Sequence, residues 1–285
     1  MAARIRPIAL PPFTVGVYAI SAVCGLLDAA SFLKLGLVFV EIMTGNIVLL
    51  AFSVGTRGTH ELASAIPTGW PYVAALACFA VGAVLGGRLV RAGETGRRIG
   101  FASDASLIGL AALVVALIHP GPVGNARYLV IAILAFAMGI QNALLLRWGI
   151  RDLATNLMTL TLARLLADST PGGGDNPRAG RRSASIVIFT ISAVAGAFMT
   201  RYGVLWPILA AFAVFALALP MLCNPRPSDP ARQPRDGDGR RCDRHARPAG
   251  PDLSLPRFCG YVEQPSEDYT ILVQDGNLLS IVRAG

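Results

Sequence analysis

Charged residues are scarce in this chain of 285 residues: Asp, Glu, Lys and Arg together make up 15% of it, whereas hydrophobic residues make up 54%. The mean hydropathy is +0.56. Soluble domains of average composition contain about 25% charged residues, so this composition excludes an ordinary soluble domain. The alternating hydrophobicity of membrane β-barrels is also absent, and we therefore expect the apolar segments to be helices.

Cysteine and histidine are also few, with five Cys and three His. The cysteines form no CxxC pair and no Cys/His spacing suited to zinc, so we predict no metal site and no cofactor. The sequence has no Gly-x-Ser-Gly motif, no His-Glu-x-x-His and no P-loop, so we do not expect an enzyme. Nucleic-acid binding is not indicated by the formal net charge of +8, because the tail's Arg and acidic residues cancel and the other basic residues, almost all Arg, lie between or beside the apolar segments.

Six apolar segments are long enough to cross a bilayer, which takes roughly 20 helical residues. They are Phe13–Leu33, Trp70–Val90, Phe101–His119, Tyr128–Leu146, Ala184–Tyr202 and Val204–Leu222. The sequence therefore predicts an all-α, polytopic transmembrane helical bundle. The first segment is too long for the apolar part of a signal peptide, so we interpret it as an uncleaved transmembrane helix.

Arginines lie in alternate loops, as orientation signals do. They are Arg4, Arg6, Arg88, Arg91, Arg97, Arg98, Arg147, Arg151, Arg178, Arg181 and Arg182. If these loops are cytoplasmic, Leu35–Gly55 enters and leaves on one side, which gives six spans with both termini inside. The alternative is seven spans with the N-terminus outside. The later segment Ile150–Asp168 is either re-entrant or an amphipathic helix along the inner surface. We expect a multi-pass protein of the bacterial inner membrane.

A pattern of polar residues occurs twice along the chain. Gly25-Leu-Leu-Asp28 is followed by Met43-Thr44-Gly45-Asn46, and Gly139-Ile-Gln141-Asn142 is followed by Met158-Thr159-Leu160-Thr161. This repetition predicts an internal duplication, with halves of about 13–119 and 128–222. The six-span topology gives the two halves opposite orientation, as in the inverted repeats of many transporters, where interrupted apolar segments mark the binding site.

Polar groups in hydrocarbon cost several kcal/mol unless they are paired, so the repeated polar residues are candidates for a substrate-binding site. The candidates are Asp28, Glu41, Thr44, Gly45, Asn46, Gln141, Asn142, Thr159 and Thr161. Asp28 either faces a cavity or lies at the outer interface, solvated or capping the next helix. We also expect Asp28 and Asn142 to meet near the axis that relates the two halves.

The second segment leaves two interpretations open. If Glu41 and Gly45 lie four residues apart on one helix face, then Glu41, Thr44 and Asn46 line one opening. In the other interpretation, Glu41 is an interfacial residue at the start of the helix, and the Asn46 amide bonds to a neighbouring helix. Thr44-Gly45-Asn46 could break a helix and expose backbone groups to a ligand.

Three pieces of the sequence resemble the YoaK-type family, bacterial integral membrane proteins grouped as a domain of unknown function. They are Gly25-Leu-Leu-Asp28-Ala-Ala-Ser-Phe32, Val38-Phe39 with Glu41-Ile-Met-Thr-Gly-Asn46, and Ala137-Met-Gly-Ile-Gln-Asn142. The resemblance runs over roughly Phe13 to Leu222 and implies a multi-helix inner-membrane protein without an established activity. Leu160 stands where the family's second repeat carries Gly, which indicates a degenerate second half-site.

From about Cys223 the chain is rich in Arg, Asp, Gly and Pro, which predicts a disordered cytoplasmic tail over 223–285. Within this tail, Tyr269–Val282 could form a hairpin around Asp275-Gly276. We expect the protein to be a small-solute transporter or permease with a polar site between the repeats, and with a proton or cation as coupling ion. Its partner is the lipid bilayer, and a homo-oligomer is compatible with the sequence. The alternative is a non-catalytic membrane scaffold or assembly factor whose polar motifs only hold helices together.

Overall fold

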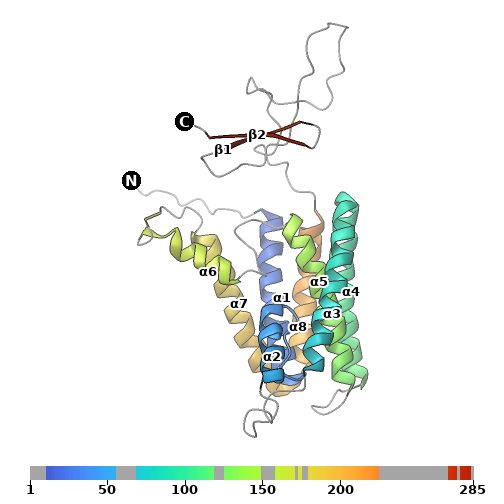
Figure 1. Ribbon diagram of the computed structural model, residues 1–285. Coiled ribbons are helices and arrows are strands. Elements are labelled where there is room, and N and C mark those ends of the chain that lie inside the picture. The colour runs from blue at the N-terminus through green and yellow to red at the C-terminus, as the bar shows by residue number, and fades with distance from the viewer. Residues whose placement is uncertain are drawn as a thin grey trace, which may run out of the picture. The chain divides into compact units, whose positions relative to one another are not determined.

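Six long helices form the main body of the protein (Figure 1). The computed structural model describes residues 11–55, 69–118, 125–148, 158–170, 173–174, 179–224, 269–274 and 277–283. The long helices are α1 (Pro12–Lys34), α3 (Trp70–Arg91), α4 (Gly93–Ile118), α5 (Ala126–Trp148), α7 (Ala179–Met199) and α8 (Leu205–Cys223). Each is long and apolar enough to cross a membrane. The predicted all-α bundle with six spans is therefore confirmed.

Two shorter apolar helices, α2 (Met43–Gly55) and α6 (Met158–Ala167), lie in the segments that the sequence marks as interrupted. The 13 residues of α2 extend over only about 20 Å at about 1.5 Å per residue. A hydrocarbon core is about 30 Å thick, so α2 is too short to cross it. The structure has the six-span arrangement, and the seven-span alternative is wrong. Figure 1 shows α2 near one end of the bundle and α6 near the other.

Helix packing repeats between the halves when α1, α2, α3 and α4 are matched with α5, α6, α7 and α8. Helix α1 packs against α7, and α5 packs against α3; likewise α1 packs against α8, and α5 against α4. Within the first half, α2 packs against α3 and α3 against α4. In the same way, within the second half, α6 packs against α7 and α7 against α8. Helices α4 and α8, the last of each half, pack against each other. Each half contributes three spanning helices. Because this number is odd, the second half must enter the membrane from the opposite side.

Glycines allow close crossings of α1 with α7 and of α5 with α3. A Cβ atom added to Gly25 of α1 would overlap the carbonyl oxygen of Phe189 in α7. In the matching position of the other half, a Cβ atom on Gly139 of α5 would overlap the carbonyl oxygen of Phe79 in α3. Small residues let helix backbones approach closely in membranes, where packing rather than the hydrophobic effect drives association. The two Gly-containing motifs of the sequence therefore lie at equivalent crossings in the two halves.

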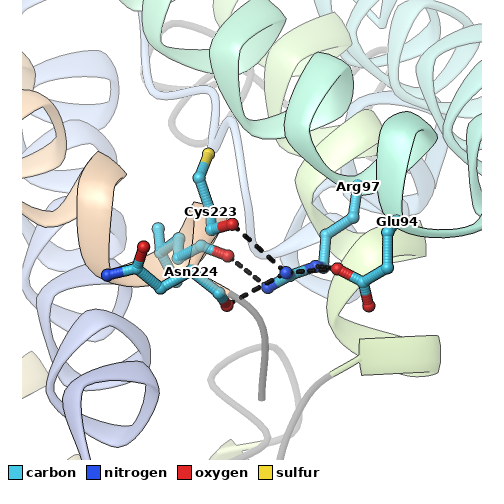
Figure 2. A network of polar contacts seen from close by, with 5 residues as sticks. Glu94, Arg97, Cys223 and Asn224 are labelled. Carbon is cyan, nitrogen blue, oxygen red and sulfur yellow. Dashed lines mark hydrogen bonds and ion pairs between the residues drawn. The ribbon is translucent and has the colours of Figure 1, made fainter.

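Arg97 closes the end of the bundle at which α1 and α4 begin and α8 ends. Its side chain is 1% exposed. The guanidinium donates hydrogen bonds to the carbonyl oxygens of Leu222, Cys223 (3.3 Å) and Asn224 (3.0 Å), as Figure 2 shows. The last carbonyls of a helix have no partners within the helix and carry a partial negative charge, so a buried cation is well placed there. Arg97 thus caps α8.

The same guanidinium also forms an ion pair within α4 and cation–π contacts with one aromatic ring from each half. It pairs with Glu94 one turn earlier in α4. Its carbon atom Cζ lies 5.9 Å from the ring centre of Phe13 in α1 and 5.7 Å from that of Trp148 in α5. Cation–π contacts at such distances contribute about 0.5–2 kcal/mol each. Arg97 therefore joins the ends of α1, α4, α5 and α8.

The C-terminal part of the chain is a separate unit, 226–285. Strands β1 (Tyr269–Gln274) and β2 (Asn277–Arg283) pair as an antiparallel two-stranded sheet. This hairpin agrees with the one predicted over Tyr269–Val282. The prediction of a disordered tail over 223–285 falls mostly on 225–268, 275–276 and 284–285, which lie outside the described residues.

We expect Gly86→Ala to destabilise the bundle and Gly87→Ala to leave it unchanged. A Cβ atom on Gly86 would lie 2.7 Å from Cβ of Ala143 and 2.8 Å from the carbonyl oxygen of Ile140, whereas a Cβ atom on Gly87 meets nothing within 4 Å. Overpacking costs about 1–3 kcal/mol, or roughly 2–10 °C in Tm for a domain of this size. Thermal unfolding of the detergent-solubilised variants measures the difference, and equal Tm values would contradict the close α3–α5 crossing.

A second prediction concerns the cap on α8. Arg97→Gln should lower the Tm by about 5 °C or more, because it leaves buried helix-end carbonyls without their charged donor. Arg98→Gln removes the same charge from an exposed neighbour and should change the Tm by less than about 2 °C. The comparison separates loss of the cap from loss of net charge. A similar small effect of both substitutions would show that Arg97 does not stabilise the end of α8.

Candidate functional site

Asp28 holds the connection between α1 and α2. Its Oδ1 atom accepts hydrogen bonds from the backbone N–H groups of Val40 (2.9 Å) and Glu41 (3.0 Å). The residue is 4% exposed, so it is buried and not solvated at an interface. As in the capping alternative, Asp28 satisfies backbone donors ahead of the next helix, but it does so from α1, twelve and thirteen residues away in sequence. Its second oxygen, Oδ2, has no hydrogen-bond partner among the described residues.

Asn46 fixes the same connection from the other end. Its side-chain amide accepts a hydrogen bond from the backbone N–H of Phe39 (2.9 Å) and donates one to the carbonyl oxygen of Phe39 (2.7 Å). The Phe39 ring stacks on Phe32, with centroids 4.5 Å apart. A Cβ atom on Gly45 would lie 2.8 Å from the Phe39 ring. Gly45 and Asn46 therefore have a packing role around Phe39, and Gly45 does not supply an unusual backbone angle.

The expectation that Glu41 and Gly45 share one helix face is wrong. Helix α2 begins at Met43, and Glu41 lies before it, held by Asp28. Thr44 is exposed, whereas Glu41 and Asn46 are buried. Glu41, Thr44 and Asn46 therefore do not line a common opening.

A buried polar cluster lies where α1, α4 and α5 meet the connection after α1. Gln141 of α5 approaches Cys24 of α1, with Nε2 3.4 Å from Sγ. The Glu41 carboxyl also lies near the Cys24 thiol. Asp28, Glu41 and Asp104 all lie close enough to Cys24 to act on it electrostatically. We call Cys24, Asp28, Glu41, Asp104 and Gln141 the central acidic cluster.

Asp104 was missed by the sequence analysis. It lies near the middle of α4, is 0% exposed, and neither of its carboxyl oxygens has a hydrogen-bond partner among the described residues. The sequence does contain an indication of Asp104, because an ionisable residue within a membrane-spanning segment is a functional candidate by default. Phe101–His119 was interpreted only as a span, and nothing in the repeated motifs pointed to it.

In the central acidic cluster, the contact between the halves is made by Gln141 with Cys24 and not by the expected pair of Asp28 and Asn142. Asn142 donates to the carbonyl oxygen of Met138 within its own helix (2.9 Å), and no hydrogen bond between it and Asp28 occurs in the described part of the chain. In α6, Thr161 is buried and Thr159 is exposed, matching the burial of Asn46 and Thr44 in α2. Residues 149–157, the counterpart of the connection before α2, lie outside the described residues.

Electrostatics in the connection favour a neutral Glu41. Burial raises the pKa of the Glu41 carboxyl well above its usual range, and the neighbouring Asp28 carboxyl raises this pKa further. Among the residues that the structure describes, no group of three or more His, Cys, Asp or Glu side chains is arranged to hold a metal ion. Carboxyl and amide oxygens such as these can exchange protons or accept hydrogen bonds from positively charged groups.

One family profile matches the chain, over residues 16–221, and its description is "Protein of unknown function (DUF1275)". The match runs from within α1 to within α8, so it includes the central acidic cluster. No curated protein and no solved structure matches the chain.

We predict that Asn46→Ala destabilises the connection, whereas Thr44→Ala does not. The first substitution leaves the N–H and C=O groups of Phe39 without their partners, which costs about 1–3 kcal/mol per group that stays buried and unpaired. The second removes an exposed hydroxyl two residues away. Limited proteolysis in detergent, with Tm as a second readout, tests the pair. Wild-type resistance of Asn46→Ala would show that Asn46 does not hold Phe39.

Proposed function

We propose that this chain, which belongs to the DUF1275 family of proteins of unknown function, as its resemblance to the YoaK-type proteins predicted, transports a small solute. The proposal includes no catalysed reaction and no bound cofactor. The protein would work as a multi-pass protein of the bacterial inner membrane. The end of the bundle that carries Arg97 would face the cytoplasm, as the positive-inside rule favours.

The observation that carries the proposal is the position of the central acidic cluster at the contact between two oppositely oriented halves. Cys24 and Asp104 lie near the middle of α1 and α4. Substrate and coupling-ion sites of inverted-repeat transporters lie near the bilayer midplane, at the interface between repeats and beside interrupted helices. Here the interrupted element is the connection from Leu35 to Ile42 followed by the short α2.

Asp28 and Glu41 have complementary parts in this proposal. Asp28 positions the connection through Oδ1 and keeps Oδ2 without a partner, and Glu41 keeps Oε1 without a partner in the described part of the chain. The free oxygens can bind a proton or cation while the bonded oxygen maintains the geometry. Movement of one half against the other would then open the cluster to either side alternately.

A scaffold function is the second candidate, and one observation favours it. Asn46, Gly45 and one oxygen of Asp28 are fully accounted for by contacts that hold the connection in place. A protein that only holds helices together needs nothing more from these residues. A scaffold does not, however, account for Oε1 of Glu41 and the two carboxyl oxygens of Asp104, which are buried without a hydrogen-bond partner in the described part of the chain.

The transport proposal predicts solute-induced charge movement that depends on Asp28. The full-length protein is reconstituted in liposomes on a solid-supported membrane and exposed to pools of amino acids, sugars, organic acids and small amines. At least one pool should produce a transient current in the wild-type protein. Asp28→Asn should reduce that current at least about tenfold, since Asn keeps an oxygen for the Val40 and Glu41 N–H groups but cannot ionise.

Thr44→Ala is the matched control, because its side chain is exposed, and it should retain the wild-type current. The thermal stability of each variant is measured in parallel, so that loss of current is not confused with unfolding. Absence of current from every pool in the wild-type protein, at acidic and neutral pH, would contradict the transport proposal and leave the scaffold function.

A further inference from the structure

Five buried oxygen atoms in the central acidic cluster have no hydrogen-bond donor among the described residues. They are Asp28 Oδ2, Glu41 Oε1, Asp104 Oδ1, Asp104 Oδ2 and Gln141 Oε1. The four residues that carry them are between 0% and 6% exposed. All five atoms are hydrogen-bond acceptors, so what the cluster needs is a hydrogen-bond donor, a proton or a positive charge.

Among the described residues, no ion pair joins a cationic side chain to the cluster. Arg97 pairs with Glu94 and Arg182 pairs with Asp168, and neither pair involves the cluster. Leaving several carboxylates buried without a counter-charge is among the most unfavourable arrangements in a protein. A bound cation is the remaining way to compensate them.

We propose that the central acidic cluster, with Asp104 as its third carboxyl group, is a binding site for an exchangeable monovalent cation, H⁺ or Na⁺, inside the helix bundle. The Gln141 side chain is the independent evidence that the acids form a site. Gln141 is neutral and fully buried, and its Nε2 is directed at Cys24 and Met138, yet its carbonyl oxygen meets no donor among the residues that the structure describes. An amide oxygen of this kind is a ligand for a cation or for the proton of a neutral carboxyl group.

The geometry selects a monovalent ion. A divalent ion such as Ca²⁺ needs six to eight close oxygen ligands, and Zn²⁺ needs about four ligands in a tetrahedron. No group of three or more His, Cys, Asp or Glu among the described residues is close enough for such a cage. A proton needs only one carboxyl oxygen, and Na⁺ needs oxygen ligands of the kinds that the unpaired carboxyl and amide oxygens provide.

The cluster is shared by both halves, which gives the ion a mechanical role. Cys24, Asp28, Glu41 and Asp104 belong to the first half, and Gln141 belongs to the second. An ion bound among them is therefore sensitive to the separation of the halves. The proposal deepens the transport proposal, since it names the coupling ion, but ion binding is measurable without any transported solute.

The titratable groups that face the cluster come from three elements. They are Cys24 and Asp28 on α1, Glu41 in the connection and Asp104 on α4, while α5 contributes only the neutral Gln141. A proton bound in the folded protein and lost on unfolding makes stability fall as pH rises above the normal range of carboxyl groups. If Na⁺ is the ion, it replaces the proton at higher pH and restores stability.

The test is the Tm of the purified full-length protein in detergent between pH 5 and pH 9, in choline chloride and in NaCl at equal ionic strength. If the ion is H⁺, the Tm should fall by roughly 3 °C per pH unit in both salts. If the ion is Na⁺, NaCl should raise the Tm at pH 8–9, with a further rise for each tenfold increase in its concentration. Asp104→Asn should remove at least half of either dependence, and Glu41→Gln is the second variant.

Asp168→Asn is the control, because it removes an exposed carboxyl group on the same protein and should retain the pH and salt dependence. A Tm that is independent of both pH and Na⁺ would overturn the proposal, as would a dependence that is unchanged in both Asp104→Asn and Glu41→Gln. Neither result bears on solute-induced currents, so the cation site can fail while the transport proposal stands.

Discussion

The fold depends on two close helix crossings, α1 on α7 and α5 on α3, at which Gly25 and Gly139 leave room for the carbonyl oxygen of a phenylalanine in the facing helix. In hydrocarbon, helices gain little by hiding apolar surface, and backbone proximity must supply the attraction. Because the first helix of each half uses the third helix of the other half, these crossings also bring the middle of α1 to the middle of α5. The central acidic cluster lies there.

Asp28 shows how one side chain can serve both structure and function. One carboxyl oxygen satisfies two backbone N–H groups in the connection before α2, where the chain leaves the helix and needs outside partners. The other oxygen remains available. Asn46 completes the arrangement through Phe39, so the connection is held at both ends while Glu41 between them reaches the cluster.

Much of this architecture was predictable because it follows from local composition. Apolar length defined the six spans, arginine placement favoured six over seven, and the repeated Gly-x-x-Asp and Met-Thr-Gly-Asn pieces indicated two halves. Glu41, in contrast, was placed in a helix, because its neighbours are apolar and nothing local shows that Asp28 takes its N–H. Asp104 was missed since it lies outside the repeated motifs, and its importance comes only from the helices that meet there.

The exchange of packing partners between the halves has a consequence for the history of the molecule. The first half of this chain on its own would leave α1 without α7 and α8, so it would expose Gly25 to lipid. Such a half would become complete beside a second copy inserted upside down. An internal duplication, as the repeated motifs predict, would therefore imply an ancestor of dual topology, an antiparallel homodimer whose two orientations became permanent when the copies were fused.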